Sequence, residues 1–396
     1  MSQAERAHSS CNTLAGLSAL IVIGIVVLGA SAAQAQTFTT LCSFNDGNNT
    51  GGNVSGQPIV DSSGKVFGTA STGGGSLYGT LWLFGSGTLS TLYAFTYSNG
   101  ANPFAGLTFG KDNELVGTTE NGGSHGAGTV FYLENGVLNV AYNFGSATGD
   151  PLFPYSGVVV KGNSLYGTSI DGGTYGFGTV WKVNIKTGKE WVLHSFAGGR
   201  DGGNPYQGTM YRDSDGDLFG VAESYGAYGC GTLFRLHAEH SFQVLHSFTC
   251  GKDGGFPSGT IAAQDGILYG TAQAHGASGH GTAWQYNISN RKFTLLHSFS
   301  GRDGSDPVGG VTCQLQNSGG CKAGLFGTTA SGGASGNGTV WEITSSRIFT
   351  TLHSFDGSDG AEPYANPFVD ANGDIYGTTF LGGTAGDGTL WEITFP

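Results

Sequence analysis

From residue 36 onward, hydrophobic residues occur in short runs that turn residues separate. Typical runs are "DIYGTT", "GTVWEI" and "FTTLHSF", which are rich in β-branched and aromatic residues and bounded by Gly, Asn, Asp or Pro. No run with a helical period of useful length follows residue 35. The pattern therefore predicts an all-β protein built from short strands.

The runs recur in a fixed order of four. The first follows a proline, as in residues 205–211, and the last ends in the phenylalanine of "TLHSF". That phenylalanine position falls at Phe44, Phe95, Phe144, Phe196, Phe248, Phe299 and Phe355. A second anchor, the Gly-Thr before a large aromatic residue, falls at Gly79, Gly128, Gly178, Gly231, Gly281, Gly338 and Gly388. Both anchors define the same seven units of about 51 residues.

Four short strands in each unit of about 50 residues are typical of a β-propeller blade. We therefore predict a seven-bladed β-propeller of four-stranded blades over residues 36–396. The two ends differ in phase, because residues 38–44 read as a fourth strand and residues 388–395 read as a third strand. We predict that residues 37–45 pair with residues 388–395, which closes the ring and removes both sheet edges.

A large aromatic residue follows each Gly-Thr pair and is predicted to fill the gap between blades. The positions are Trp82, Phe131, Trp181, Phe234, Trp284, Trp341 and Trp391. Glycines between the second and third strands, such as Gly382 and Gly383, are predicted to form turns with positive φ. A glycine-rich loop can also bind phosphate, but that use needs a helix N-terminus, and none is readable here.

The repeated pattern "LHSF-x-G-x-DG-x-x-P … LYGTT-x-x-GG-x-x-G-x-GTVW" resembles the Gloeo/Verruco-type tandem repeat, abbreviated GloVer, of exported bacterial proteins. The resemblance covers roughly residues 38–394. It implies a secreted, propeller-like repeat protein, frequently with a C-terminal sorting anchor, which we do not expect here. It implies no activity that could be assigned to particular residues.

The first 35 residues differ in composition from the repeats. Residues 14–30 form an apolar run, and Ala33 and Ala35 provide an A-x-A cleavage site. We predict a secretory signal peptide over residues 1–35, with an uncleaved anchor as the alternative. No second apolar stretch is long enough to span a bilayer. The mature chain is therefore expected to be secreted or periplasmic, without a membrane span.

The net charge of −12 argues against nucleic acid and anionic membranes as partners. The charge does not identify which partner the protein binds. We expect the protein to be a monomer. Export permits disulfides. Cys313 and Cys321 flank an insertion in the sixth unit, and Cys230 and Cys250 flank one hairpin, so these two pairs are predicted to be bridged. The second pair should meet where Thr232 faces Phe248, and Cys42 should remain free.

Four histidines at equivalent positions of "LHSF" could suggest a metal site, namely His194, His246, His297 and His353. They lie on the outermost strands, where equivalent positions of neighbouring blades diverge, so we interpret them as structural. Asp213, Asp215 and Asp217 alternate as in half of an EF-hand loop, but the distal glutamate is missing. A hairpin turn is the favoured interpretation of that segment, with calcium binding as the alternative. No other metal or cofactor is predicted.

Aromatic residues that follow the prolines should lie at the mouth of the central channel, which is the usual ligand face of propellers. They are Phe104, Tyr155, Tyr206 and Tyr364. His125, His275 and His280 lie on neighbouring loops of the same rim. Together these residues are the candidate ligand site for a sugar or a peptide, while the alternative is that the rings only plug the blade ends.

No nucleophile elbow, zincin motif or nucleotide fingerprint occurs in the sequence. The first strands carry almost no His, Glu or Arg, so no catalytic residues are assigned. We therefore predict a binding or scaffold module for an extracellular ligand. The alternative is an extracellular carbohydrate-active enzyme, a lyase or hydrolase, on a propeller scaffold.

Overall fold

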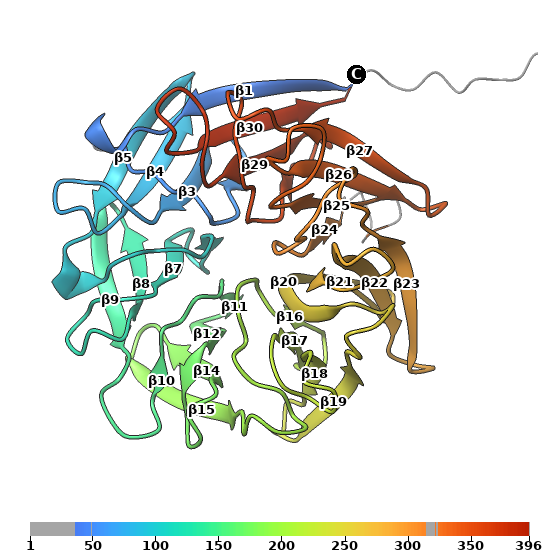
Figure 1. Cartoon of the computed structure of the whole chain (residues 1–396). Helices are drawn as coiled ribbons and strands as arrows, with labels where there is room; N and C mark the ends of the chain where they lie inside the picture. Colours follow the sequence, from blue (N-terminus) through green and yellow to red (C-terminus); the bar gives the residue numbers. More distant parts are fainter. Residues whose placement is uncertain (1–35, 49, 314–320, 322–323, 396) are drawn as a thin grey trace, which may run out of the picture. The chain divides into compact units, whose positions relative to one another are not determined.

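The computed structural model describes residues 36–48, 50–313, 321 and 324–395. These residues form seven four-stranded antiparallel sheets, arranged as blades around a ring (Figure 1). The predicted seven-bladed propeller is confirmed. The predicted signal peptide, residues 1–35, lies outside the described residues. Within the described residues, no helix has the length and apolar character needed to cross a membrane.

Each blade runs from an innermost strand near the axis to an outermost strand at the periphery. The innermost strands are β2 (Ile59–Val60), β6 (Thr108–Phe109), β11 (Val159–Lys161), β16 (Tyr211–Arg212), β20 (Gly255–Gln264), β24 (Val311–Cys313) and β28 (Phe368–Val369). The second strands are β3 (Val66–Ala70), β7 (Leu115–Thr119), β12 (Ser164–Ser169), β17 (Leu218–Ala222), β21 (Ile267–Ala274), β25 (Gly324–Thr329) and β29 (Ile375–Thr379). We number the blades 1 to 7 in this order.

The outer half of each blade is more regular. The third strands are β4 (Thr80–Gly85), β8 (Thr129–Glu134), β14 (Thr179–Asn184), β18 (Thr232–Leu236), β22 (Thr282–Asn287), β26 (Thr339–Thr344) and β30 (Thr389–Thr394). The outermost strands are β5 (Thr88–Ala94), β9 (Val137–Asn143), β15 (Lys189–Ser195), β19 (Phe242–Ser247), β23 (Lys292–Ser298), β27 (Phe349–Ser354) and, in blade 7, β1 (Thr37–Ser43). A small extra sheet pairs β10 (Pro151–Leu152) with β13 (Asp171–Gly172).

The ring closes as the sequence predicted. Strand β1 pairs antiparallel with β30, with Thr37 opposite Thr394 and Ser43 opposite Thr389. Blade 7 therefore contains both ends of the described propeller (Figure 1). Because β1 and β30 pair with each other, no open sheet edge remains between the first and last units.

The innermost strands are shorter than predicted, except for β20 in blade 5. We expected a strand over residues 205–211, but β16 begins only at Tyr211. Gln207 has a φ of 45° and Gly208 a φ of 82°, and both values interrupt an extended strand. This segment also bonds to the next blade, since the Ile261 N–H donates to the Thr209 carbonyl (3.2 Å).

The core between blades is built on the aromatic residue of each third strand. All five tryptophans at this position, and Phe131 and Phe234 in blades 2 and 4, are fully buried. The second strand offers a glycine beneath each ring. A Cβ atom on Gly377, for example, would lie 2.1 Å from Cζ2 of Trp391. The "YGT" triplet of the repeat therefore supplies the space that the "GTVW" ring fills.

Both predicted disulfides are present. Cys230 bonds to Cys250 with a Cα–Cα distance of 5.6 Å, and Cys313 bonds to Cys321. Cys42 is free, and burial raises the pKa of its thiol to about 12, although a backbone hydrogen bond at Leu390 opposes the shift.

The predicted register at the first of these disulfides is wrong by one residue. Thr232 pairs with Ser247 and not with Phe248. A β-bulge between Leu233 and Phe234 shifts the two strands relative to each other. The two cysteines lie just beyond the paired residues and still meet.

Candidate functional site

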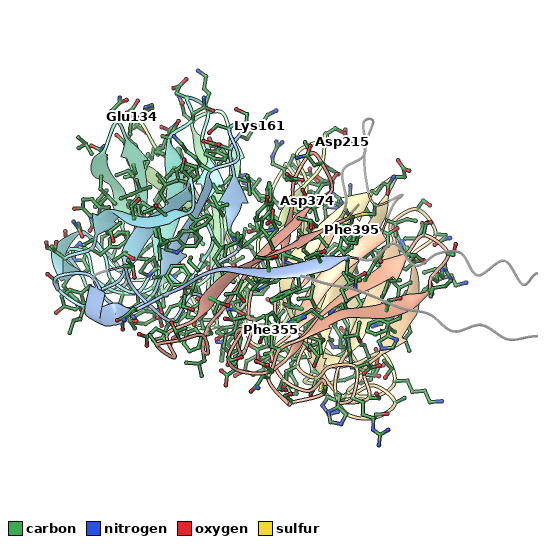
Figure 2. The ribbon with its side chains drawn as sticks, turned by 90° about the horizontal axis from the view of Figure 1, so that it is seen from above. Glu134, Lys161, Asp215, Phe355, Asp374 and Phe395 are labelled. Carbon is green, nitrogen blue, oxygen red and sulfur yellow. A yellow bond between two sulfur atoms is a disulfide. The ribbon has the colours of Figure 1, made fainter. Side chains whose placement is uncertain are left out.

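The propeller has two rims with different loops. One rim, which we call the hairpin rim, carries the turns within blades, and Figure 2 shows Glu134, Lys161 and Asp215 there. The opposite rim, on the side where Figure 2 labels Phe355, carries the loops from fourth to first strands and from second to third strands. These two kinds of loop pair with each other, as Ala361 does with Leu381 and Gly203 with Ser224. We call this the mouth rim.

A left-handed residue turns the chain from the mouth rim toward the axis in several blades. It comes directly before the proline of the repeat, and it is Asn102 in blade 2 (φ 55°), Asn204 in blade 4 (φ 49°) and Glu362 in blade 7 (φ 55°). Asparagine tolerates this conformation better than most side chains. Its amide also joins blades, since the Asn204 Nδ2 donates to the Ile170 carbonyl of the preceding blade (3.2 Å).

A central cavity of about 910 Å³ runs between the innermost strands and is lined by residues of all seven blades. It is narrowed at blades 4 to 6, where backbones approach closely. A Cβ atom on Gly208 would lie 1.9 Å from the Gly259 carbonyl carbon, and one on Gly259 would lie 2.1 Å from the Gly310 nitrogen. The Thr260 N–H also donates to the Gly309 carbonyl (3.0 Å). The cavity volume lies within the range of small-molecule sites.

Three of the four predicted aromatic residues form a stacked column at the mouth. The ring centroids of Phe104 and Tyr155 are 4.6 Å apart with planes inclined by 19°, and those of Tyr155 and Tyr206 are 4.7 Å apart and inclined by 21°. The three rings come from blades 2, 3 and 4, and all are partly buried. Burial raises the pKa of Tyr155, and the neighbouring Tyr206 adds to the shift. The structure therefore joins residues that lie about 50 positions apart in the chain.

Tyr364, the fourth predicted ring, lines the same cavity from blade 7 but stands outside the column. It packs edge-on against Phe380, with ring centroids 5.2 Å apart. Its hydroxyl donates to a carboxylate oxygen of Glu362 (3.1 Å). Burial, with a smaller contribution from the Glu362 charge, raises the pKa of Tyr364 to about 12.

Two carboxylates near the column were missed by the sequence analysis. Glu120 and Glu223 directly follow the second strands of blades 2 and 4, and burial raises the pKa of both. Their charges act on Tyr206, whose pKa is also raised, chiefly by burial. The sequence signal for these carboxylates is the variable residue that follows the "GTT" of each repeat. Gln273 occupies the same position in blade 5, and its Nε2 donates to Glu223 Oε1 (3.4 Å).

The three predicted histidines lie on the outer loops of the mouth rim. His125 is exposed on the loop between β7 and β8. His275 and His280 face each other across the loop between β21 and β22. His275 packs against Phe256 (ring centroids 5.7 Å apart), and His280 Nδ1 lies 3.0 Å from Ser305 Oγ. Within the described chain, no contact links any of them to the aromatic column.

Each "LHSF" histidine packs against a phenylalanine of the next blade, which agrees with the structural interpretation of these histidines. His353 stacks on Phe38 of the next blade (3.6 Å between centroids, planes inclined by 4°) and its Nε2 lies 2.7 Å from Asp359. Equivalent pairs join His194 to Phe242, His246 to Phe293 and His297 to Phe349. The aspartate of each "DG" loop is thus a partner of the preceding histidine.

The burial of these histidines between blades predicts that the folded protein loses stability in mild acid. Burial lowers the pKa of His194 and His246 below the ordinary value, although Asp201 and Asp253 oppose the shift. The unfolded chain therefore binds more protons than the folded one below a pH of about 6.5, so protonation favours unfolding. We expect urea unfolding between pH 7.5 and 5 to show a smaller acid loss for the His194→Gln/His246→Gln variant than for the parent. An equal or larger acid loss in the variant would contradict this.

The Asp213–Asp217 turn behaves as a hairpin turn. Asp213 Oδ1 accepts the N–H groups of Gly216 and Asp217 (both 2.9 Å). Asp217 is buried and accepts from Arg235 Nε (2.6 Å) and the Ala238 N–H (2.9 Å), and Asp215 is exposed. Asp213 already accepts the N–H groups of its own turn and Arg235 already neutralises Asp217, so the calcium alternative gains no support.

The fold and the mouth define a propeller with an aromatic-lined axial cavity. The family model of the Gloeobacter/Verrucomicrobia repeat matches residues 150–324. This match confirms the resemblance over those residues, and the chain is a seven-bladed propeller that carries the repeat there.

Solved structures are similar in fold only. An oligogalacturonate lyase in complex with manganese has a TM-score of 0.58 at 13% identity, covering 92% of this chain and 94% of that one. An oligogalacturonate lyase from Vibrio parahaemolyticus has a TM-score of 0.55 at 11% identity, covering 91% and 93%. The extracellular domain of a putative one-component system from B. thetaiotaomicron has a TM-score of 0.49 at 12% identity, and 86% of this chain spans 38% of it. No curated protein matches the sequence.

Proposed function

We propose that the protein is an exported binding module that holds a carbohydrate at the mouth of its axial cavity. The observation that carries this proposal is the column of Phe104, Tyr155 and Tyr206 from three consecutive blades, whose first two rings line the cavity of about 910 Å³. The ring edges and the outer faces of the column offer apolar surface to a sugar ring. The two disulfides support export, because they persist in oxidising compartments.

Polar groups around the column suit hydroxyl-rich ligands. Tyr364 offers a phenol from blade 7. Glu120, Glu223 and Gln273 offer acceptors and donors from the C-terminal ends of the second strands, near Tyr206. Pockets that bind small molecules combine such a mainly apolar wall with a few polar groups that fix orientation. A sugar presents both an apolar face and a rim of hydroxyls, so it matches this combination.

The cavity lining favours binding over turnover. Among the described residues that line it, the charged side chains are Lys161, Arg212 and Asp213. Lys161 and Arg212 end the strands β11 and β16, and Asp213 begins the turn that follows, so all three lie toward the hairpin rim, where Figure 2 places Lys161, at the end opposite the column. The lyase or hydrolase alternative needs an acid and a base beside the bound sugar, and the carboxylates next to the column, Glu120 and Glu223, lie outside the cavity lining.

A glycan array with the mature chain, residues 36–396, tests the proposal. Tyr206→Ala should weaken binding of an array hit by about 1–3 kcal/mol, as for other aromatic anchors, with little change in melting temperature. Tyr206→Phe separates the hydroxyl from the ring, and Tyr132→Ala is the control, because Tyr132 lies on β8, the third strand of blade 2, and not in the aromatic column. If Tyr206→Ala lowers stability but leaves affinity unchanged, the ring is a structural plug and the mouth is not the site.

A further inference from the structure

Large hydrophobic side chains are exposed on only one sector of the described mouth rim. They are Leu77, Tyr78, Tyr97, Tyr175, Tyr225 and Tyr228, with exposed fractions between 37% and 69%. All six belong to loops of blades 1 to 4. The equivalent loops of blades 5 to 7 carry small residues instead, such as Ala277, Ala334 and Ala385. This sector is therefore distinguished from the rest of a repetitive rim.

Several of these rings are held in place by contacts. Tyr78 packs against Tyr97 (ring centroids 5.4 Å apart), and Tyr225 packs edge-on against Phe177 (5.0 Å). The Cys230–Cys250 disulfide fixes the loop that carries Tyr228. Tyrosines that are held before binding lose little entropy when a ligand covers them.

The exposed rings are continuous with the aromatic column. The Asn102 N–H, two residues before Phe104, donates to the Tyr78 carbonyl (2.9 Å). In the same way, the Asn204 N–H, two residues before Tyr206, donates to the Phe177 carbonyl (2.8 Å), and Phe177 packs on Tyr225. Each exposed loop is thus bonded to the segment that carries a ring of the column.

The mouth rim is acidic. In the described part of its loops the basic residues are Arg200, Lys252 and Arg302, and none lies in the loops of blades 1 and 2. Carboxylates such as Glu120, Asp171 and Glu223 are spread over the same loops, so most of the net charge of −12 lies on this side. A face of one sign repels ligands of the same sign.

We propose that the binding surface continues from the mouth over blades 1 to 4, and that its ligand is an extended, uncharged glycan chain. This rests on the proposed carbohydrate function. The column would hold one part of the chain, and the exposed rings would contact sugars further along it. The acidic rim disfavours uronate chains such as oligogalacturonate. A folded protein partner fits less well, because these loops place glycine, serine and threonine between the exposed rings, whereas protein interfaces bury a mainly apolar centre.

Calorimetric titration with defined oligosaccharides tests the proposal. The probes are cello-, xylo-, manno- and laminari-oligosaccharides of two and six units, with hexagalacturonate and a chitosan hexamer as charged probes. For at least one neutral series we expect the hexasaccharide to bind about tenfold or more tightly than the disaccharide. Hexagalacturonate should not bind at low salt.

The variant Tyr175→Ala/Tyr228→Ala should remove this gain with length and leave disaccharide affinity within about twofold. Val137→Ala/Ile348→Ala is a matched control on the hairpin rim, since Val137 and Ile348 are 60% and 61% exposed and Tyr175 and Tyr228 are 60% and 62% exposed. It should bind like the parent.

The outcomes separate this proposal from the function on which it rests. If Tyr206→Ala abolishes binding but Tyr175→Ala/Tyr228→Ala leaves binding unchanged, the mouth is the site and the proposed extension over blades 1 to 4 is wrong. Equal affinity for two and six units would also overturn the extension. Tighter binding of hexagalacturonate or chitosan than of every neutral hexasaccharide would overturn the uncharged ligand. Binding of library peptides in place of every glycan, with loss in the rim variant, would overturn a glycan altogether.

Discussion

Deleting residues 36–45 from the mature protein is expected to lower the free energy of unfolding by more than about 5 kcal/mol. The deletion removes Phe44, which is fully buried and lies 5.2 Å from the Trp82 ring. It also removes Phe38, which covers His353. Truncation of one buried phenylalanine alone costs about 3–5 kcal/mol, and a typical domain is stable by only about 5–15 kcal/mol. The remaining β30 would present an unpaired edge.

A circular permutant provides the control for this deletion. Thr37 pairs with Thr394, so Phe395 and Gln36 can be joined by a short turn, with new termini opened at the exposed turn between β26 and β27. This variant keeps the β1–β30 pairing and should melt within a few degrees of the parent. Thermal unfolding of the parent, the deletion and the permutant measures the contribution of closure.

A point substitution covers the case in which the deletion variant is not recovered folded. Phe44→Ala should lose about 3–5 kcal/mol in urea unfolding, because the ring is fully buried between blades 7 and 1. A deletion variant that melts like the parent would show that pairing of β1 with β30 contributes little.

The sequence predicted the blades and their closure because the evidence was local and repeated. Each strand is short and bounded by turn residues, and seven copies make the period visible even where one copy is irregular. The phase difference between the two ends then required one shared blade. The disulfides followed from flanking positions, so the error of one residue in register at Thr232 did not change the pairing.

The candidate site was predictable only in part. The proline before each ring placed Phe104, Tyr155 and Tyr206 near the axis, but a stacking distance depends on the angle between blades, which no repeat pattern encodes. Gln207, which helps to shorten the innermost strand of blade 4 by its left-handed backbone, is not a glycine and so gave no signal. Glu120 and Glu223 were missed because they occupy a position that varies between units, whereas the repeat pattern records only what the units share.

Gly377→Ala is expected to destabilise the protein by about 3 kcal/mol, although it adds one methyl group. Gly377 lies on β29 beneath the buried ring of Trp391, and a Cβ atom there would meet Cζ2 at 2.1 Å. Neither residue has room to move, because Trp391 also packs against Phe355 of blade 6 (ring centroids 5.9 Å apart). Overpacking of a close-packed core is relieved only by strained rotamers or backbone shifts.

Three further variants test whether contact with the Trp391 ring causes the loss of stability in Gly377→Ala. Gly75→Ala should be nearly neutral, because its added Cβ atom would have no neighbour within 4 Å and its backbone is ordinary. Gly117→Ala in blade 2 should cost less than Gly377→Ala, since its Cβ would meet the smaller Phe131 ring at 2.8 Å. Trp391→Phe should cost less in the Gly377→Ala background than in the parent, because the two changes relieve each other. Additive losses in this cycle, measured by urea unfolding, would mean that the glycine is required for a reason other than the ring above it.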